Sequence, residues 1–218
     1  MSILIDKAIT DPGVSYLVLD TRSAQVIASR WIHVQRPIPA GSLVKPLIAL
    51  AYGETHTGHF PEYTCSGQCW LRRGHGQLNL EKALANSCNS YFRELWKGVD
   101  PAALVQVCAR LGVPLPSGNS WKVSPLDLAR SFGQLDGPVL AGLRQAAQSG
   151  TAKAVGGNAL AKTGTTECTH VPRQAGDGLA IALFPAEAPR YTVLVRKDGA
   201  TGANAAIVAG RIRTLVLP

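Results

Sequence analysis

Strand-favouring segments lie near both ends of this chain of 218 residues, and a long helical stretch separates them. The runs VSYLVLD (14–20) and QVIASRWI (25–32) are rich in β-branched and aromatic residues, and the short segment between them indicates a hairpin. Strands return only in NALAKTGT (158–165), GLAIALF (178–184) and RYTVLVRK (190–197). Because helices fill the interval, we expect one antiparallel sheet built from the two ends of the chain.

The interval from Leu43 to about Leu143 has apolar residues at the three-to-four spacing of helices, and Gly and Pro clusters divide it. Residues 203–217 have the same spacing and should cover one face of the sheet. We therefore predict an α+β fold, with an antiparallel sheet of about five strands flanked by helices and an inserted, mainly helical subdomain. The active site is expected in the groove between them.

The chain is expected to form a single catalytic domain over residues 1–218. Residues 1–53 and 138–218 would make the lobe that contains the sheet, and residues 54–137 would make the helical subdomain. A chain of this length can bury a sizeable interior. Its 46% apolar and 17% charged residues also favour a folded chain over a disordered one, so function should reside in a site.

The formal net charge of +8 implies attraction to some polyanion, or simply a solvated basic surface. Aromatic residues make up only 6% of the chain and the basic residues are scattered, so we expect no nucleic-acid partner. The N-terminal run is interrupted by Asp6 and Lys7, and we expect it to be neither a signal peptide nor a membrane anchor.

The segment PAGSLVKPLIAL contains a serine and a lysine one helical turn apart, Ser42 and Lys45. A serine hydroxyl becomes a nucleophile when a base takes its proton, and a lysine three residues later lies on the same helical face. Pro46 is tolerated only in the first turn of a helix, so the helix should begin close to Ser42. On spacing alone, an ordinary helix cap followed by a solvated lysine explains the pattern better.

Two further motifs favour the catalytic interpretation. Ser87-Cys88-Asn89 places a hydroxyl and a carboxamide at the end of an apolar helical run, where they can relay a proton and hold a substrate amide. A similar triplet at 117–119 lies in a Pro/Gly loop, and we prefer the first. Lys162-Thr163-Gly164 ends a predicted strand, where a lysine can bind a carboxylate and depress the pKa of a nearby lysine.

These three motifs, in this order, resemble the signature of the penicillin-binding protein transpeptidases and serine β-lactamases, which is S-x-x-K, then S-x-N, then K-[ST]-G. The likeness extends beyond the motifs, because segments such as GHGQLNLEKALANSCNSYF and VSPLDLARSFGQL are similar to successive transpeptidase segments. Nearly the whole chain is covered. The chain looks like a minimal or excised catalytic domain, without the extra N-terminal module and membrane anchor that are usual in the family.

The resemblance implies that Ser42 is the acylated nucleophile and Lys45 its base. Ser87 would relay a proton toward the leaving amine, and Asn89 would hold the amide of the acyl chain.

The same resemblance assigns roles to the third motif. Lys162 and Thr163 would recognise the carboxylate of the peptide or β-lactam, Gly164 would keep the strand edge open, and Thr165 would contact substrate. The backbone N–H groups of Ser42 and Thr165 would form the oxyanion hole.

The implied function is D,D-transpeptidase or D,D-carboxypeptidase chemistry in bacterial cell-wall synthesis, with peptidoglycan stem peptides as substrates, β-lactam antibiotics as acylating ligands, and no cofactor. The implied location is extracytoplasmic, and a protein partner could supply the missing modules. A β-lactam sensor or scaffold that is acylated without turnover, and a serine β-lactamase, are the alternatives. A hydrolase needs a base for its deacylating water, such as a carbamylated lysine or one of the carboxylates Glu94, Asp100, Asp127 and Asp136.

Five cysteines leave the redox compartment open, and only CSGQC holds a close pair. The surrounding segment offers zinc-type side chains without a standard zinc-finger spacing, so we expect no metal. The weak candidates are His56, His59, Cys65, Cys69 and His75. A Cys65–Cys69 disulfide and free thiols are the other readings, and Cys88 is expected to be a core thiol.

Overall fold

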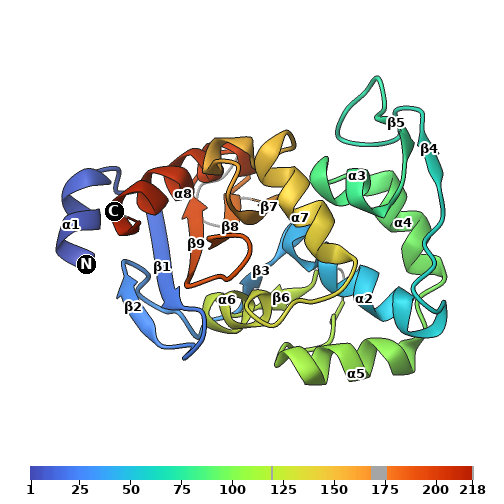
Figure 1. Cartoon of the computed structure of the whole chain (residues 1–218), viewed down its shortest axis with the longest axis horizontal. Helices are drawn as coiled ribbons and strands as arrows, with labels where there is room; N and C mark the ends of the chain where they lie inside the picture. The colour runs from blue at the N-terminus through green and yellow to red at the C-terminus, as the bar shows by residue number, and fades with distance from the viewer. Residues whose placement is uncertain (119, 168–175, 218) are drawn as a thin grey trace.

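The computed structural model describes residues 1–118, 120–167 and 176–217, and it contains a five-stranded antiparallel sheet (Figure 1). The strand order is β2-β1-β9-β8-β7. The strands are β1 (Val14–Asp20), β2 (Val26–Ser29), β7 (Leu160–Thr165), β8 (Gly178–Phe184) and β9 (Tyr191–Lys197). The predicted fold is therefore confirmed: both chain ends build one sheet, and helices flank it. The proposed subdomain boundaries at residues 54 and 137 stay a prediction.

Strand β8, which lies next to the edge strand β7, is buried on both faces. Leu179, Ile181 and Leu183 belong to the core cluster on the helical side, whereas Ala180 and Ala182 belong to the cluster under the C-terminal helix α8 (Gly202–Val216). Successive residues of a strand point to opposite faces, so β8 directs branched side chains to the helical side and the two small alanines to the side of α8. The two alanines let α8 pack closely on β8, and α8 also contacts β9, so this helix covers one face of the sheet, as predicted.

The remaining helices are separated by the Gly- and Pro-rich segments that the sequence analysis identified. They are α1 (Ser2–Ala8), α2 (Lys45–Thr55), α3 (Leu80–Ala85), α4 (Asn89–Lys97), α5 (Pro101–Leu111), α6 (Pro125–Phe132) and α7 (Val139–Gln148), with 3₁₀ turns η1 (Gly41–Val44) and η2 (Lys153–Val155). Asn79, Asp100 and Ser124 cap α3, α5 and α6 by accepting a backbone N–H three residues on. Every residue from 45 to 51 of α2 is buried, so this helix forms the centre of the helical side.

Three features were missed by the sequence analysis. The segment that opens the chain forms helix α1, and two short strand pairs lie within the predicted helical interval. These pairs join β3 (Ile38–Pro39) to β6 (Lys122–Val123) and β4 (Tyr63–Cys65) to β5 (Gly76–Leu78). Segments of two or three residues are too short to show periodicity. In the described ranges, no helix combines the length and apolar character needed to span a bilayer.

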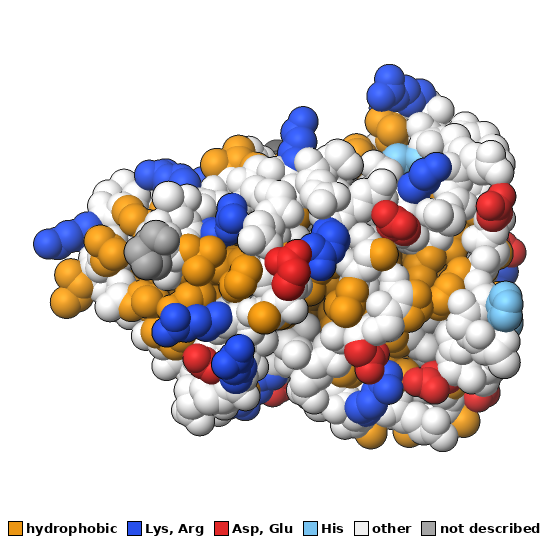
Figure 2. All heavy atoms as spheres, in the orientation of Figure 1, with side chains coloured by type: hydrophobic (Ala, Val, Ile, Leu, Met, Phe, Trp, Pro, Cys, Tyr) orange, Lys and Arg blue, Asp and Glu red, His pale blue; other side chains and the backbone are white. Residues whose placement is uncertain are grey.

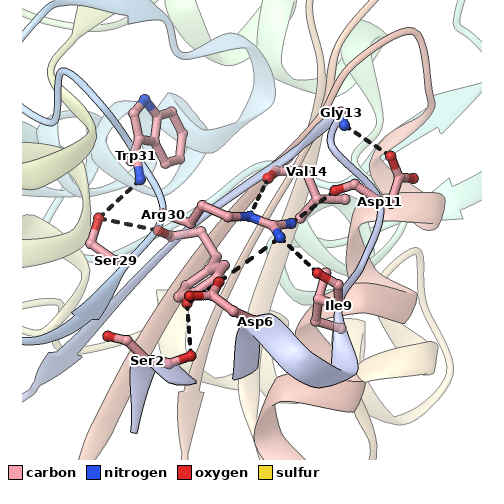
Figure 3. A network of polar contacts seen from close by, with 10 residues as sticks. Ser2, Asp6, Ile9, Asp11, Gly13, Val14, Ser29, Arg30 and Trp31 are labelled. Atoms are coloured by element: carbon pink, nitrogen blue, oxygen red, sulfur yellow. Dashed lines mark hydrogen bonds and ion pairs between the residues drawn. The ribbon is translucent and has the colours of Figure 1, made fainter. Parts of the chain in front are cut away.

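Arg30, just after β2, fastens α1 and the following turn to the sheet (Figure 3). Its guanidinium donates to the carbonyl oxygens of Ile9 at 2.7 Å, Asp11 at 2.8 Å and Val14 at 3.1 Å. It also lies 3.9 Å from the Asp6 carboxylate, which accepts a hydrogen bond from Tyr16 Oη at 2.8 Å. One planar cation thus satisfies the backbone of a segment that has little secondary structure of its own.

We predict that Arg30→Met lowers the free energy of unfolding by about 2 kcal/mol, because three carbonyl groups lose a charged donor. Urea unfolding followed by circular dichroism would measure the change. The exposed Arg22 lies at the opposite end of the β1–β2 hairpin, and Arg22→Met should change stability by less than about 0.5 kcal/mol. Equal effects of the two substitutions would contradict this role for Arg30.

Candidate active site

Ser42 lies in the 3₁₀ turn η1, which continues directly into α2 at Lys45. Pro46 occupies the first turn of α2, where its missing N–H costs no helical hydrogen bond, so the helical segment begins where the sequence predicted. Gly41 precedes the serine with φ of 53°. Ser42 is partly exposed while Lys45 is buried, so the hydroxyl faces an opening and the amine lies behind it.

The Lys45 amine makes three hydrogen bonds with the Ser87-Cys88-Asn89 motif. Its Nζ donates to the Ser87 carbonyl oxygen at 2.7 Å, to Ser87 Oγ at 3.2 Å and to Asn89 Oδ1 at 2.6 Å. Ser87 has a positive φ of 50°, which is uncommon for a residue other than glycine, and this conformation aims both its carbonyl and its hydroxyl at the lysine. The first two predicted motifs therefore form one buried cluster.

Lys162 completes this cluster from the edge strand β7. Its side chain has no exposed surface, and its Nζ donates to Ser87 Oγ at 2.8 Å and to the Thr163 carbonyl at 2.7 Å. Ser87 Oγ thus accepts from two lysine amines, and its own proton is the donor that remains free for another acceptor.

Burial changes the acidity of both amines. It lowers the pKa of Lys45 to about 7, against partial opposition from the thiols of Cys88 and Cys69. It lowers the pKa of Lys162 well below its ordinary value, and the charge on Lys45 lowers that pKa further. The sequence analysis assigned the electrostatic effect to Lys162 acting on Lys45. Here the electrostatic effect is seen in the other direction, because the charge on Lys45 adds to burial in lowering the pKa of Lys162.

The end of β7 lies against η1. A β-carbon on Gly164 would lie 3.3 Å from the Ser42 nitrogen, and one on Gly41 would lie 3.4 Å from the Thr165 carbonyl oxygen. These short distances bring the backbone of Thr165 next to that of Ser42. Within the described part of the chain β7 pairs only with β8, so its other edge faces the serine.

Thr163 and Thr165 alternate with Lys162 along β7, so their side chains lie on the face of the strand opposite to that of Lys162. Thr163 is buried and its hydroxyl donates to Thr151 Oγ1 at 2.6 Å, while Thr165 is exposed and its Oγ1 accepts from the Gly202 N–H at 3.1 Å. Thr165, which directly follows this motif, is exposed to solvent. The structure thus brings Ser42, Lys45, Ser87, Asn89 and Lys162 close together, whereas the buried Lys162 and Thr163 do not line the open cavity.

A cavity of about 700 Å³ opens beside Ser42. Ser42, Lys45 and Asn89 lie on its polar side, and aromatic side chains form much of the rest. The lining residues that the motifs did not predict include Ile48, Gln68, Phe92, Arg93, Trp96 and Trp121. Phe92, Arg93 and Trp96 follow Asn89 on α4, so the helical spacing after the second motif could have identified them.

The loop that holds the alternative triplet at 117–119 contributes Pro116, Gly118 and Ser120 to the same cavity. Asn119 lies outside the described residues. The preference for Ser87-Cys88-Asn89 over this triplet is supported by the lysine contacts of the first motif.

The CSGQC cysteines do not form the disulfide considered from the sequence, and the four cysteines in the described ranges are free. Cys65 Sγ contacts His75 Nδ1 at 3.6 Å, and Cys69 Sγ contacts Cys88 Sγ at 3.8 Å. His56 instead stacks on Tyr52, with ring centroids 3.7 Å apart, and His59 contacts Thr57. Two of the five metal candidates are therefore excluded from the group, and Cys88, expected to be a plain core thiol, joins it. Cys168 lies outside the described residues.

No family model matches this chain, and no curated protein matches it. Solved structures do. Pseudomonas aeruginosa PBP2 in complex with WCK 5153 superposes with a TM-score of 0.82 at 18% identity, over 99% of this chain and 74% of that one. The D,D-transpeptidase domain of a peptidoglycan glycosyltransferase from Eggerthella lenta gives 0.82 at 15% identity, over 99% and 80%.

Penicillin-binding protein 3 from Mycobacterium tuberculosis, complexed with aztreonam, gives a TM-score of 0.76 at 16% identity, over 99% of this chain and 75% of that one. At these identities the likeness establishes the fold. This chain has the fold of penicillin-binding protein transpeptidase domains, as the motif resemblance implied.

We predict that Lys45 titrates with a midpoint near pH 7 in the folded protein, because burial disfavours its charged form. The neutral amine, which is the form able to accept a proton, then becomes dominant as the pH rises through that value. NMR of protein with lysine labelled at ¹³Cε would follow this titration among the eight lysines of the chain.

The assignment can be checked with Lys45→Met. This substitution should remove the transition near pH 7 and raise the pKa of Lys162, since one charge that depresses it is gone. Retention of the transition in Lys45→Met would contradict the assignment.

Proposed function

We propose that this chain, which has the fold of penicillin-binding protein transpeptidase domains, is a penicillin-binding serine acyltransferase that acts on peptidoglycan stem peptides through an acyl-enzyme at Ser42. The observation that carries the proposal is the buried cluster in which Ser87 Oγ accepts hydrogen bonds from both Lys45 and Lys162. If Ser42 were only a helix cap, Lys45 would not need buried contacts with Ser87 and, through it, with Lys162. The cluster therefore favours a catalytic role for Ser42 over a capping role.

In the proposed acylation step, neutral Lys45 takes the Ser42 proton and the serine oxygen attacks the carbonyl carbon of the penultimate D-alanine. The C–N bond then breaks, and the leaving amine receives a proton from the Lys45 ammonium through Ser87. The hydrogen bond from Lys45 to Ser87 Oγ supports this route, because it connects base and relay directly. Asn89, which lines the cavity, would hold the amide of the acyl chain.

The proposed oxyanion hole consists of the backbone N–H groups of Ser42 and Thr165. The close approach of Gly164 and Gly41 to the opposite backbone supports it, because a side chain at either glycine would separate η1 from β7. Such donors act at the point where negative charge develops on the carbonyl oxygen.

The substrate carboxylate is proposed to bind at the end of β7. Thr165, as the exposed residue of this strand end, is favoured for direct contact. Lys162 and Thr163 were expected to make this contact as well, but their burial favours an indirect part: Lys162 fixes Ser87, and Thr163 anchors the strand through Thr151.

An amine from a neighbouring stem would resolve the acyl-enzyme as a cross-link, and water would resolve it as a trimmed peptide. A β-lactam sensor or a serine β-lactamase are the alternatives. Hydrolysis is less favoured, because none of the four carboxylates considered for the deacylating base lines the cavity in the described part of the chain. Glu94 pairs with Lys97, Asp100 caps α5, Asp127 contacts Ser124, and Asp136 lines a separate cavity.

The basic residues form no single patch on the face shown in Figure 2. In Figure 2, Lys and Arg side chains are spread over the visible face among acidic and apolar groups, with no continuous stripe. The expectation of no nucleic-acid partner stays a prediction. A peptidoglycan-facing, extracytoplasmic location and a protein partner remain parts of the proposal.

The acylation proposal predicts a covalent adduct with benzylpenicillin on the wild-type protein, seen by intact-mass spectrometry, and none on Ser42→Ala. Lys45→Ala should form the adduct at least about 100-fold more slowly, since it removes the general base. Ser23→Ala, in the exposed β1–β2 turn, serves as a matched serine control and should label like wild type. Absence of the wild-type adduct would contradict acylation of Ser42.

The fate of the adduct separates the three candidate activities. A transpeptidase or a carboxypeptidase should hold the penicilloyl adduct for a long time and should release D-alanine from a pentapeptide that ends in D-Ala-D-Ala. The transpeptidase needs an amine acceptor for this release, whereas the carboxypeptidase uses water. Rapid loss of the adduct with hydrolysed penicillin would instead favour a β-lactamase. A stable adduct without any peptide turnover would favour a sensor.

A further inference from the structure

Four side chains of the kind that bind zinc converge next to the proposed active site. Cys65, Cys69, His75 and Cys88 each offer a ligand atom, and these atoms all lie within 4.8 Å of one another. They come from the end of β4, the loop before β5, and the turn before α4. Free thiols and an imidazole from three segments seldom meet in this way without a common partner.

Two of the six distances within the group match the edges of a tetrahedron around zinc, and all six are at most 4.8 Å. With Zn–S bonds of about 2.3 Å and Zn–N bonds of about 2.05 Å, tetrahedral geometry places two sulfurs about 3.8 Å apart and a sulfur and a nitrogen about 3.5 Å apart. The Cys69–Cys88 sulfurs are 3.8 Å apart, and Cys65 Sγ lies 3.6 Å from His75 Nδ1. A disulfide would need a sulfur separation of about 2.05 Å, so the geometry fits a bridging ion better.

The surroundings of the ligands are also built for a metal. Backbone N–H groups of Asn89, Ser90 and Leu71 donate to Cys69 Sγ, with Asn89 N at 3.1 Å, and such donors stabilise a thiolate ligand. His75 turns Nδ1 toward Cys65 Sγ, so Nδ1 is the nitrogen offered to the ion, and the other ring nitrogen, Nε2, is buried without a hydrogen-bond partner among the described residues. The Trp70 ring packs edge-on against His75.

The loop that carries Cys69 depends on glycine. Gly67 and Gly74 have φ of 118° and 75°, and a β-carbon on them would lie 2.2 Å from the Arg72 carbonyl oxygen and 2.1 Å from that of Cys65. Only glycine allows the backbone to double back so tightly between Cys65 and His75. The fold therefore holds these ligands close to one another before any ion binds.

We propose that Cys65, Cys69, His75 and Cys88 form a structural zinc site that ties the β4–β5 hairpin to the Ser87-Cys88-Asn89 motif. Three thiolates and a neutral imidazole fill all four tetrahedral positions, so the site is closed and structural, and the ligand set favours zinc over harder cations. Binding of Zn²⁺ by the three thiols releases three protons and leaves a complex with one negative charge.

The position of Cys88 gives this site its significance. It lies between Ser87 and Asn89, both of which contact the Lys45 amine. A metal that holds the Cys88 sulfur would fix the intervening backbone, including the strained conformation of Ser87. The proposed site thus positions two members of the acylating cluster, and one of its ligands, Cys69, also lines the cavity beside Ser42.

Metal analysis of protein purified without added zinc, by inductively coupled plasma mass spectrometry, should find about one zinc per chain. Cys69→Ser and Cys88→Ser should each lose most of this zinc. Cys108→Ala is the matched control, because Cys108 is a buried free thiol on α5 outside the group, and it should retain the zinc. Equal zinc content in wild type, Cys69→Ser and Cys88→Ser would overturn the proposal.

Cobalt substitution covers the case in which the variants fail to fold. Apo wild type titrated with Co²⁺ should develop thiolate-to-cobalt charge-transfer bands and the visible bands of tetrahedral cobalt, saturating at about one equivalent. Hydrogen exchange of residues 65–90 should slow on binding. A spectrum typical of octahedral oxygen ligands, or a native Cys69–Cys88 disulfide in intact-mass spectra of freshly purified protein, would contradict the site. None of these measurements depends on acylation, so the zinc site can be confirmed or refuted independently of the proposed function.

Discussion

Two lysine amines share a single serine hydroxyl in the interior of this protein, and the active-site arrangement depends on that contact. Lys45 belongs to the central helix, Lys162 to the edge strand, and Ser87 to the turn between α3 and α4. Two neighbouring ammonium groups without a solvent shell repel each other strongly, so burial forces at least one of them to be neutral at ordinary pH. The contact can form only when the sheet and the helical part have come together, so the chemistry of the site is tied to completion of the fold.

The arrangement of the strands could be predicted from the sequence because β1, β8 and β9 each have at least five apolar or β-favouring residues. The helical spacing of residues 203–217 predicted the helix that covers one face of the sheet, and α8 lies over Ala180 and Ala182 of β8. The S-x-x-K helix start was predictable because Pro46 restricts where a helix can begin. In these cases the local preference of the chain and its tertiary environment agree.

The details that escaped prediction depend on contacts between distant segments. The orientation of Lys162 is set by Ser87, which is 75 residues away, and spacing within KTG carries no information on it. Cys88 was predicted to be a core thiol because it lies between Ser87 and Asn89, and its side chain was expected to point away from theirs. Cys88 does lie in the core, where its sulfur contacts Cys69 in the loop between β4 and β5. This contact was not predicted, because strands of three residues show no periodicity in the sequence. Trp121 reaches the cavity from the segment just before β6, a strand of two residues that is too short to show a pattern in the sequence.

The edge strand β7 has a consequence for how this protein behaves in a crowded solution. A strand edge with unpaired N–H and C=O groups can accept an extended peptide, and it can equally accept a strand from another copy of the chain. Here the backbone of η1 lies against β7 at Gly164, so that part of the strand edge is covered by the chain itself. The inward-pointing Lys162 further penalises any shift of register, because a slip by one residue would carry its amine out of the cluster. The strand edge that suits a short peptide is therefore poorly suited to polymerisation.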